Sequence, residues 1–319
     1  MSFTIENIRE ARERIAPYIA RTPLLRLQNL DSYLGCQVYV KAECMQTTGA
    51  FKLRGAMNKM LSLTPEQLKN GVVASSSGNH GRAVAYAARM LGTKATIVMP
   101  NSAPAMKLNA IKALGAEIVM CEPSERHAAA DRICEETGAV LVPPFNDPAI
   151  MAGQGTAGLE IAEDCPDVDV VITPLSGGGL LSGVATAVRT LCPNARVYGA
   201  EPAPLPRYTV SLAEGKAVTV PQKPTIADAL IGQTPGSHCF PVVQQHVAGT
   251  LPVDDAYTLK AMKLLLTEGK LLGEPAACIG MGAVLQGLLP VKPEEKVCFL
   301  VSGGNVGFEQ LRVLDDVTL

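Results

Sequence analysis

The amino-acid sequence predicts an α/β protein with two domains, each an open, mostly parallel, twisted sheet with helices on both faces. Short apolar runs, typical of buried strands, alternate with helical patterns, and this alternation favours parallel sheets covered on both sides. With 319 residues, 47% of them hydrophobic and 18% charged, the chain can form one large or two medium domains. We expect a small domain at residues 48–146 and a larger domain formed by residues 1–47 and 147–319.

The elements of the small domain follow one another at short intervals. Residues 71–74 are apolar and indicate a buried strand, residues 75–81 are rich in Ser, Gly and Asn and indicate a turn, and the alanine-rich residues 82–91 predict a helix. The same patterns predict a helix at 53–63, a strand at 95–100, a helix at 105–114, a strand at 116–120, a helix at 125–137 and a strand at 139–142.

The larger domain is expected to begin with a helix at 5–15, an extended connector at 21–24 and a short strand at 38–43. Residues 202–241 are rich in proline and polar residues and predict surface loops with short helices. The remaining predicted elements are a helix opened by 153–156, a strand at 168–174, a helix at 181–191, a strand at 196–200, helices at 255–268 and 276–289, and a strand at 297–301.

Composition and charge argue against several classes of partner. The net charge of −2 gives no electrostatic reason to expect nucleic acid or an anionic membrane, and no apolar run approaches the length of about 20 residues that a membrane helix needs. The nine cysteines are scattered without zinc spacing, as is typical of reduced thiols, and the first 30 residues lack an apolar signal core. We therefore expect a cytoplasmic protein without a bound metal.

Lys52 is the first candidate functional residue. It lies between Phe51 and Leu53, and an apolar setting disfavours the charged ammonium form of lysine. A lysine with a lowered pKa is a nucleophilic amine that bonds readily to carbonyl carbons. The alternative interpretation is a surface lysine on a short helix.

Three predicted strands end in turns of small residues, at 75–81, 176–179 and 302–305. Ligands of open α/β sheets bind outside the carboxyl ends of the strands, so these turns are candidates for one shared pocket. The segment at 176–179, a serine followed by three glycines, precedes a helix and suits a phosphate, although it matches neither the dinucleotide fingerprint nor a P-loop. The alternative is a tight structural turn. A phosphate site together with a buried amine suggests pyridoxal 5'-phosphate (PLP).

With these features the chain resembles the serine/threonine dehydratase and serine racemase family of PLP enzymes. Members of this family have the fold of the tryptophan synthase β-subunit, which is called PLP fold type II. The resemblance covers nearly the whole chain. It rests on these motifs, in this order: Arg21-Thr22-Pro23-Leu24, Lys41-Ala42-Glu43, Thr48-Gly49-Ala50-Phe51-Lys52-Leu53-Arg54-Gly55-Ala56, Ser76-Ser77-Gly78-Asn79-His80-Gly81, Gly153-Gln154-Gly155-Thr156, Ser176-Gly177-Gly178-Gly179-Leu180 and Ser302-Gly303-Gly304-Asn305.

The resemblance implies a role for each motif residue. Lys52 bonds the cofactor aldehyde and later moves the Cα proton, Phe51 packs beside the ring, and Ser302 meets the pyridine nitrogen. Asn79 contacts the ring hydroxyl. The phosphate is held by the backbone of Ser176, Gly177, Gly178, Gly179 and Leu180, and the substrate carboxylate is surrounded by Ser76, Ser77, Asn79 and His80.

The resemblance also implies the reaction. We expect a dehydratase, or ammonia-lyase, that converts L-threonine, L-serine or a related small β-hydroxy amino acid to a 2-oxo acid and ammonia, as a homodimer in amino acid catabolism. The alternatives are a serine racemase, with Ser77 as an acid/base opposite Lys52, and a dehydratase specialised for 3-hydroxyaspartate. Otherwise Ser77 contacts the carboxylate. A different class, an α/β protein that binds a phosphorylated ligand without covalent chemistry, also remains open.

The chain departs from the family pattern at several positions. Ala50 stands where many relatives have serine, and Ser176 replaces the first of four glycines. Glu201 matches the start of the divalent-metal site of the racemases, but Arg207 stands where an aspartate ligand is expected, which argues against a metal. The sequence ends soon after Ser302 without the regulatory domain of biosynthetic threonine dehydratases, which favours a catabolic or specialised enzyme.

Overall fold

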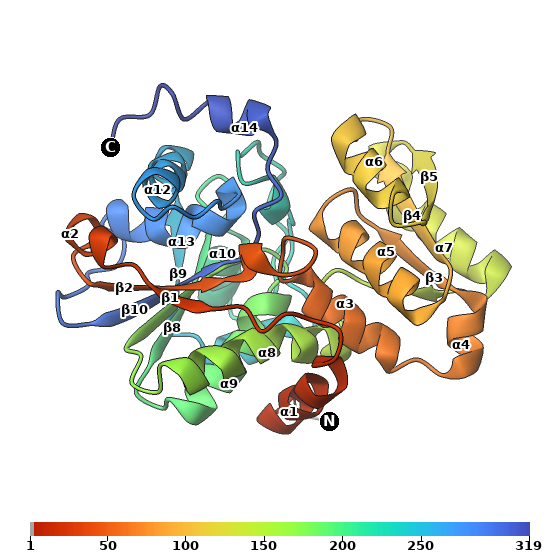
Figure 1. The fold of residues 1–319 in the computed structure, drawn as a ribbon, viewed down its shortest axis with the longest axis horizontal. Coiled ribbons are helices and arrows are strands. Elements are labelled where there is room, and N and C mark those ends of the chain that lie inside the picture. Colours follow the sequence, from red (N-terminus) through yellow and green to blue (C-terminus); the bar gives the residue numbers. More distant parts are fainter. Residues whose placement is uncertain (1–2) are drawn as a thin grey trace.

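The computed structural model describes residues 3–319 and contains two separate sheets with helices around them (Figure 1). The predicted α/β class with mostly parallel sheets is confirmed. The larger sheet has the order β1-β2-β10-β7-β8-β9 and the smaller has the order β5-β4-β3-β6. The strands are β1 (Leu24–Arg26), β2 (Gln37–Ala42), β3 (Val72–Ser75), β4 (Ala95–Pro100), β5 (Glu117–Cys121), β6 (Val140–Leu141), β7 (Val170–Pro174), β8 (Arg196–Pro202), β9 (Gly249–Val253) and β10 (Lys296–Val301).

Helices follow most of the strands, as a parallel sheet requires. They are α1 (Ile5–Ile15), α2 (Asp31–Leu34), α3 (Lys52–Leu61), α4 (Pro65–Asn70), α5 (Asn79–Leu91), α6 (Ala105–Lys112), α7 (Arg126–Thr137), α8 (Pro148–Asp164), α9 (Gly179–Leu191), α10 (Arg207–Glu214), α11 (Cys239–His246), α12 (Asp255–Thr267), α13 (Pro275–Leu285) and α14 (Phe308–Arg312). Among the described residues, no helix combines the length and the apolar character that crossing a membrane requires.

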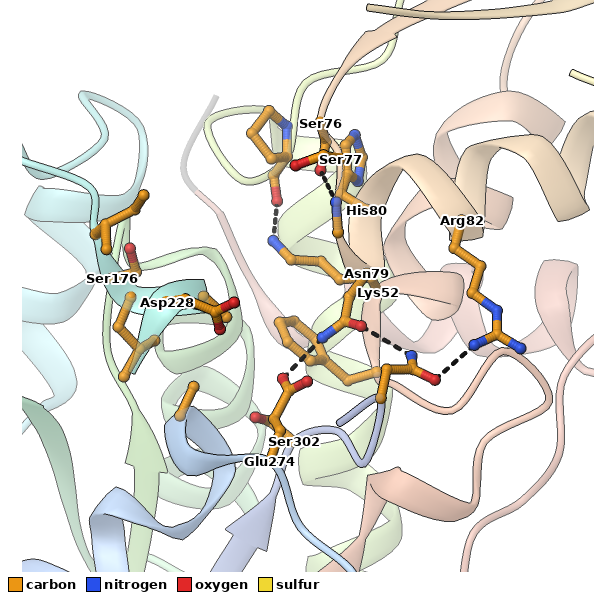
Figure 2. Close-up of a pocket in the computed structure, with 18 of the residues that line it drawn as sticks. Lys52, Ser76, Ser77, Asn79, His80, Arg82, Ser176, Asp228, Glu274 and Ser302 are labelled. Atoms are coloured by element: carbon orange, nitrogen blue, oxygen red, sulfur yellow. Dashed lines mark hydrogen bonds between the residues drawn. The ribbon is translucent and has the colours of Figure 1, made fainter. Parts of the chain in front are cut away.

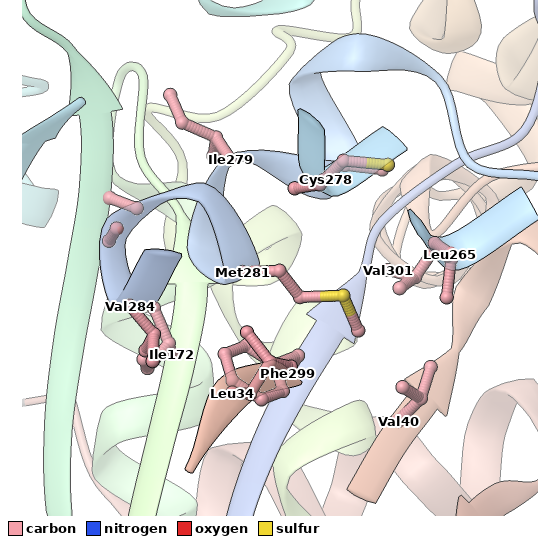
Figure 3. Packing of buried hydrophobic residues seen from close by; sticks show 14 of the residues in the cluster. Leu34, Val40, Ile172, Leu265, Cys278, Ile279, Met281, Val284, Phe299 and Val301 are labelled. Atoms are coloured by element: carbon pink, nitrogen blue, oxygen red, sulfur yellow. The ribbon is translucent and has the colours of Figure 1, made fainter. Parts of the chain in front are cut away.

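Both sheets are covered on both faces, because successive side chains of a strand point in opposite directions. In the small sheet, Val72 packs in one hydrophobic cluster with residues of α3 and α5, and Val73 packs in another with residues of α7. In the large sheet, Ile172 belongs to the cluster that includes α12 and α13, whereas Val171 belongs to the cluster that includes α9. Figure 3 shows Met281 of α13 close to Phe299 of β10 in the first of these clusters.

The four-stranded sheet lies entirely within residues 72–141, inside the range 48–146 predicted for the small domain. It lies at the right of Figure 1, and α3 runs between it and the large sheet. The exact domain boundaries stay a prediction, and residues 1–2 of the predicted 1–47 segment lie outside the described residues.

Two strands of the large sheet were not predicted. The segment read as an extended connector ends in β1, which pairs antiparallel with β2, and β9 pairs parallel with β8 at the other edge. β9 contains Gly249 and Pro252, residues that weaken a strand pattern. Proline is tolerated there because an edge strand leaves one side of its backbone unpaired.

The helix predicted to open at 153–156 instead begins at Pro148, after Asp147, whose carboxylate accepts the N–H groups of Ala149 and Ile150. The glycines that suggested a helix start serve close packing in the middle of α8. A Cβ on Gly153 would lie 2.5 Å from the carbonyl oxygen of Arg54, and a Cβ on Gly155 would lie 3.0 Å from that of Gly183. The Gly-x-Gly pattern of this segment therefore reflects close packing between helices and does not mark the start of a helix.

Candidate active site

A cavity of about 470 Å³ lies where the turns after β3, β7 and β10 meet (Figure 2). The carboxyl ends of parallel strands gather the loops of a sheet at one edge, which is why segments far apart in the sequence meet here. All the site residues predicted from the sequence line this one cavity: Phe51, Lys52, Ser76, Ser77, Asn79, His80, Ser176, Gly177, Gly178, Gly179, Leu180 and Ser302.

Lys52 is the first residue of α3, and its side chain is partly buried. Its Nζ donates a hydrogen bond of 2.5 Å to the carbonyl oxygen of Pro144 and lies 5.1 Å from the centre of the Phe51 ring. Removal from water disfavours the ammonium ion and lowers the pKa of Lys52 to about 8. An amine with this pKa is neutral in a useful fraction of molecules near neutral pH.

The segment before Lys52 is fastened to the end of β10. The N–H of Phe51 donates to the carbonyl oxygen of Ser302 at 3.0 Å, and the N–H of Gly304 donates to that of Gly49 at 2.9 Å. These backbone bonds hold Lys52 beside the buried Ser302. The lysine segment and the third predicted turn are therefore joined directly by backbone hydrogen bonds.

A buried ion network holds α3 from the other side. The Arg54 guanidinium bonds Glu43 at 2.8 Å and Glu160 at 2.7 Å, and Lys41 bonds Glu160 at 2.5 Å. Arg54, Glu43 and Lys41 have no solvent exposure, and Glu160 has almost none. The network joins β2, α3 and α8, so the helix that carries Lys52 is anchored to the large sheet.

The turn between β7 and α9 leaves no room for side chains at its three glycines, 177–179. Gly178 has φ +98°, and a Cβ on it would lie 1.9 Å from the Tyr208 hydroxyl oxygen. A Cβ on Gly177 would lie 2.3 Å from the Phe145 ring. The turn leads into α9, a helix of 13 residues whose N-terminal N–H groups and dipole favour an anion.

Asn79 is held by partners from two segments beside the large sheet, one before α13 and one after β10. Its Nδ2 donates to Glu274 at 2.8 Å, and its Oδ1 accepts from Asn305 at 2.8 Å. Arg82 donates to the Oδ1 of Asn305 at 2.6 Å, so the chain of bonds runs from α5 to the segments before α13 and after β10 (Figure 2). Burial, reinforced by the negative charge of Asp228, raises the pKa of Glu274 to about 7.

His80 is buried at the back of the cavity. Its Nε2 donates to the carbonyl oxygen of Val142 at 2.8 Å, which leaves Nδ1 as an acceptor. Burial, and then the charge of Lys52, lowers the pKa of His80 to about 3, so the ring is neutral near neutral pH. Within residues 3–319, His80 Nδ1 and the buried Ser75 hydroxyl have no hydrogen-bond partner, as expected of groups that meet a ligand.

Sequence reasoning missed several residues of this cavity, namely Glu274, Arg82, Lys107, Arg126 and Asp228. Lys107 and Asp228 form an ion pair of 2.9 Å between α6 and the 202–241 segment, and the Arg126 Nε donates to the Pro123 carbonyl oxygen at 3.2 Å. None belongs to a Gly- or Ser-rich turn. Of these residues, only Glu274 had a recognisable sequence context, because it directly precedes Pro275, the first residue of an apolar helix.

Comparison with known proteins places this fold and site in a family. Residues 15–303 match the family described as pyridoxal-phosphate dependent enzyme. L-threonine ammonia-lyase from Thermotoga maritima is 43% identical over 305 residues, which cover 95% of this chain and 76% of that protein. L-threo-3-hydroxyaspartate ammonia-lyase from Saccharomyces cerevisiae is 38% identical over 317 residues, covering 98% and 96%. The structure of maize serine racemase aligns with a TM-score of 0.94 at 40% identity, covering 98% of this chain and 97% of that one.

The chain belongs to the family of pyridoxal-phosphate dependent enzymes, and within it to the fold type II group that contains ammonia-lyases and serine racemases. The resemblance read from the motifs is thereby confirmed, and so is PLP as the cofactor. A binding protein without covalent chemistry is no longer favoured.

The residues present fit this cofactor. An aldehyde needs an amine, which Lys52 supplies with a lowered pKa. A phosphate needs N–H donors without side chains in the way, and a Cβ on any of the glycines 177–179 would collide with its neighbours. The aromatic side chain of Phe51 and the hydroxyl of Ser302 lie in the same cavity, where a planar heterocycle would meet them.

Proposed function

We propose that this protein is an ammonia-lyase that converts L-threonine, L-serine or a related β-hydroxy amino acid to a 2-oxo acid and ammonia. The position of Lys52 carries the proposal, because its desolvated amine shares a cavity with the glycine turn at 176–179 and with Asn79. The likeness to the ammonia-lyase of Thermotoga maritima supports the reaction class.

The proposed roles follow from the chemistry of each side chain. When bound, PLP supplies an electron sink that stabilises negative charge at the substrate Cα. Lys52 holds the cofactor aldehyde and, as a neutral amine, takes the Cα proton at Nζ. We assign Ser302 to the pyridine nitrogen. A hydroxyl does not force protonation of that nitrogen as a carboxylate would, so negative charge at Cα is short-lived and loss of the β-hydroxyl is favoured.

The substrate carboxylate is assigned to the N-terminus of α5. Ser76, Ser77, Asn79 and His80 surround the start of this helix of 13 residues, whose positive end favours an anion. Phe51 is assigned to the side of the cofactor ring and the 176–180 segment to its phosphate.

Arg126 favours a second candidate substrate, L-threo-3-hydroxyaspartate. This guanidinium lines the cavity, and within the described residues it donates only to the backbone carbonyl oxygen of Pro123. A second carboxylate on the substrate would give it a charge-assisted partner. The yeast relative at 38% identity is named for this substrate.

Ser77 favours a third candidate, serine racemisation. Ser77 and Lys52 line the same cavity from different segments, and a racemase needs a proton donor on the face opposite the lysine. The likeness to maize serine racemase supports this alternative.

One experiment separates these candidates. The purified protein with PLP is incubated in turn with L-threonine, L-serine and L-threo-3-hydroxyaspartate, and both 2-oxo acid and D-serine are measured. We expect 2-oxo acid from at least one substrate. D-serine without any oxo acid would favour the racemase, and no oxo acid from any of the three would reject the lyase.

We also propose a cytoplasmic homodimer that acts in amino acid catabolism. The nine cysteines are all free thiols, which suits a reducing compartment. Exposed apolar side chains such as Met45, Phe308 and Val313 are candidates for a subunit contact. Sedimentation equilibrium tests the dimer.

A further inference from the structure

Arg207, at the start of α10, is completely buried and faces an equally buried carboxylate. Its guanidinium donates to three backbone carbonyl oxygens: Nε to Leu205 at 3.1 Å, Nη1 to Leu175 at 3.0 Å and Nη2 to Leu230 at 2.8 Å. The Glu201 carboxylate lies 3.9 Å from Nε. All three guanidinium nitrogens therefore have an oxygen partner.

The bonded carbonyls belong to segments that border the cavity. Leu175 directly precedes the turn at 176–179, here called the phosphate turn, and Leu230 closes the short helix η4 (Asp228–Leu230), whose residues also line the cavity, with Asp228 on the same side as Ser176 (Figure 2). Leu205 lies in the connection between β8 and α10. One side chain outside the cavity thus ties the start of the phosphate turn to η4, a second segment of the cavity lining.

The carbonyl oxygens of Leu175, Leu205 and Leu230 and the Glu201 carboxylate form a cage of oxygen atoms around Arg207. Such a cage has the chemistry of a cation site. Backbone carbonyls and a carboxylate are the oxygen ligands that hard divalent cations take. The carboxylate is held in place, since Glu201 accepts the N–H groups of Tyr208 at 3.0 Å and Thr209 at 2.7 Å. A guanidinium keeps its charge in proteins and offers donors in a fixed plane, so it can satisfy such a cage without an ion.

We propose that Arg207 is a positioning residue that acts as a built-in cation, and that it sets the phosphate turn for PLP without help from a divalent metal ion. The walls of the phosphate site are then held by the chain itself. Chelators and added divalent ions leave the wild-type protein unchanged.

The test measures PLP affinity and thermal unfolding of the apoprotein in EDTA and in CaCl₂. Arg207→Asp leaves two buried carboxylates and no cation, so a divalent ion is needed to restore neutrality. Arg207→Met also removes the cation but supplies no second carboxylate. Arg189→Asp is the matched control, because Arg189 also donates to backbone carbonyls, but these belong to Pro193 and Ala195, in a segment that does not border the active-site cavity.

In EDTA we expect both Arg207 variants to bind PLP at least about tenfold more weakly than wild type, the loss expected for hydrogen bonds to a charged group. CaCl₂ should restore the affinity and raise the unfolding temperature of Arg207→Asp alone, while wild type and Arg189→Asp respond to neither condition. Wild-type PLP affinity that falls in EDTA, or normal affinity in Arg207→Met, would overturn the proposal. If Arg207→Asp does not fold, Arg207→Met and the wild-type chelator series still decide it.

Discussion

The amide of Asn79 donates a hydrogen bond of 2.8 Å to the buried carboxylate of Glu274, and this bond joins α5 to the segment before α13. The two residues come from elements that flank different sheets, so the contact ties the predicted substrate-binding turn to the larger part of the molecule. Because burial raises the pKa of Glu274 to about 7, its carboxyl group titrates near neutral pH.

The stability of the apoprotein should depend on Glu274 between pH 4.5 and 7. Burial raises its pKa from 4.5 to about 7, so in this interval the folded protein binds more protons than the unfolded chain. Stability therefore falls as the pH rises, by about 3 kcal/mol across the interval. Glu274→Gln keeps the acceptor for Asn79 but cannot ionise, so urea unfolding at several pH values should show a flatter profile than wild type. The exposed Glu66→Gln serves as the control, and an unchanged slope in Glu274→Gln would refute the assignment.

The ion network under α3 should be a major contributor to stability. Arg54→Met leaves Glu43 and Glu160 buried with Lys41 as the remaining cation, and breaking a buried pair from one side costs about 3–5 kcal/mol. Urea unfolding measures the loss. The exposed pair of Arg312 and Glu309 provides the comparison, and Arg312→Met should change stability little. A similar small change in Arg54→Met would contradict the role given to this network.

The turns of the site could be predicted because their function requires an unusual composition. Glycines at 177 and 178 are needed where a Cβ would overlap Phe145 or Tyr208, and such runs stand out in a sequence. The cavity residues Glu274, Arg126 and Asp228 lie in ordinary contexts, and only the folded chain brings them to the pocket.

The fold was predictable for a related reason. Strands covered on both faces are nearly continuous apolar runs, as β7 and β10 are, whereas the edge strand β1 has three residues, all partly exposed, and the edge strand β9 is partly exposed and contains Gly249 and Pro252. The predicted start of α8 at 153–156 was wrong because glycine is common both at helix starts and where helices pack closely. Gly153 must be small because α3 passes against it.

Arg126 should control the choice between substrates. Arg126→Met removes the cavity guanidinium, and we expect KM for L-threo-3-hydroxyaspartate to rise at least about tenfold while KM for L-threonine changes less, because only the former offers a second carboxylate. Steady-state kinetics with both substrates measure the difference. Arg132→Met, an exposed position on the same helix α7, should leave both values unchanged. Equal loss for the two substrates would argue against the role of Arg126 in recognising a second carboxylate.

Ser77 should separate elimination from racemisation. Elimination from the L-amino acid needs a base on the lysine side alone, so Ser77→Ala should keep 2-oxo acid formation within about tenfold of wild type. Any D-serine formation should be lost. Chiral chromatography and an oxo-acid assay on the same reaction give both rates, with Ser76→Ala for comparison. Parallel loss of both products would instead indicate that Ser77 acts only through the substrate carboxylate and has no separate role in racemisation.

The identity of the amine that bonds the cofactor decides the account most directly. The protein is saturated with PLP, reduced with borohydride, digested and analysed by mass spectrometry, with Lys52→Ala and Lys59→Ala treated alike. Lys59 lies on the same helix and pairs with Asp147, and it does not line the cavity. We expect the reduced adduct on Lys52 in wild type and Lys59→Ala, no adduct in Lys52→Ala, and a loss of activity on the order of 10³-fold in that variant. An adduct on another lysine, or one that persists in Lys52→Ala, would contradict the account.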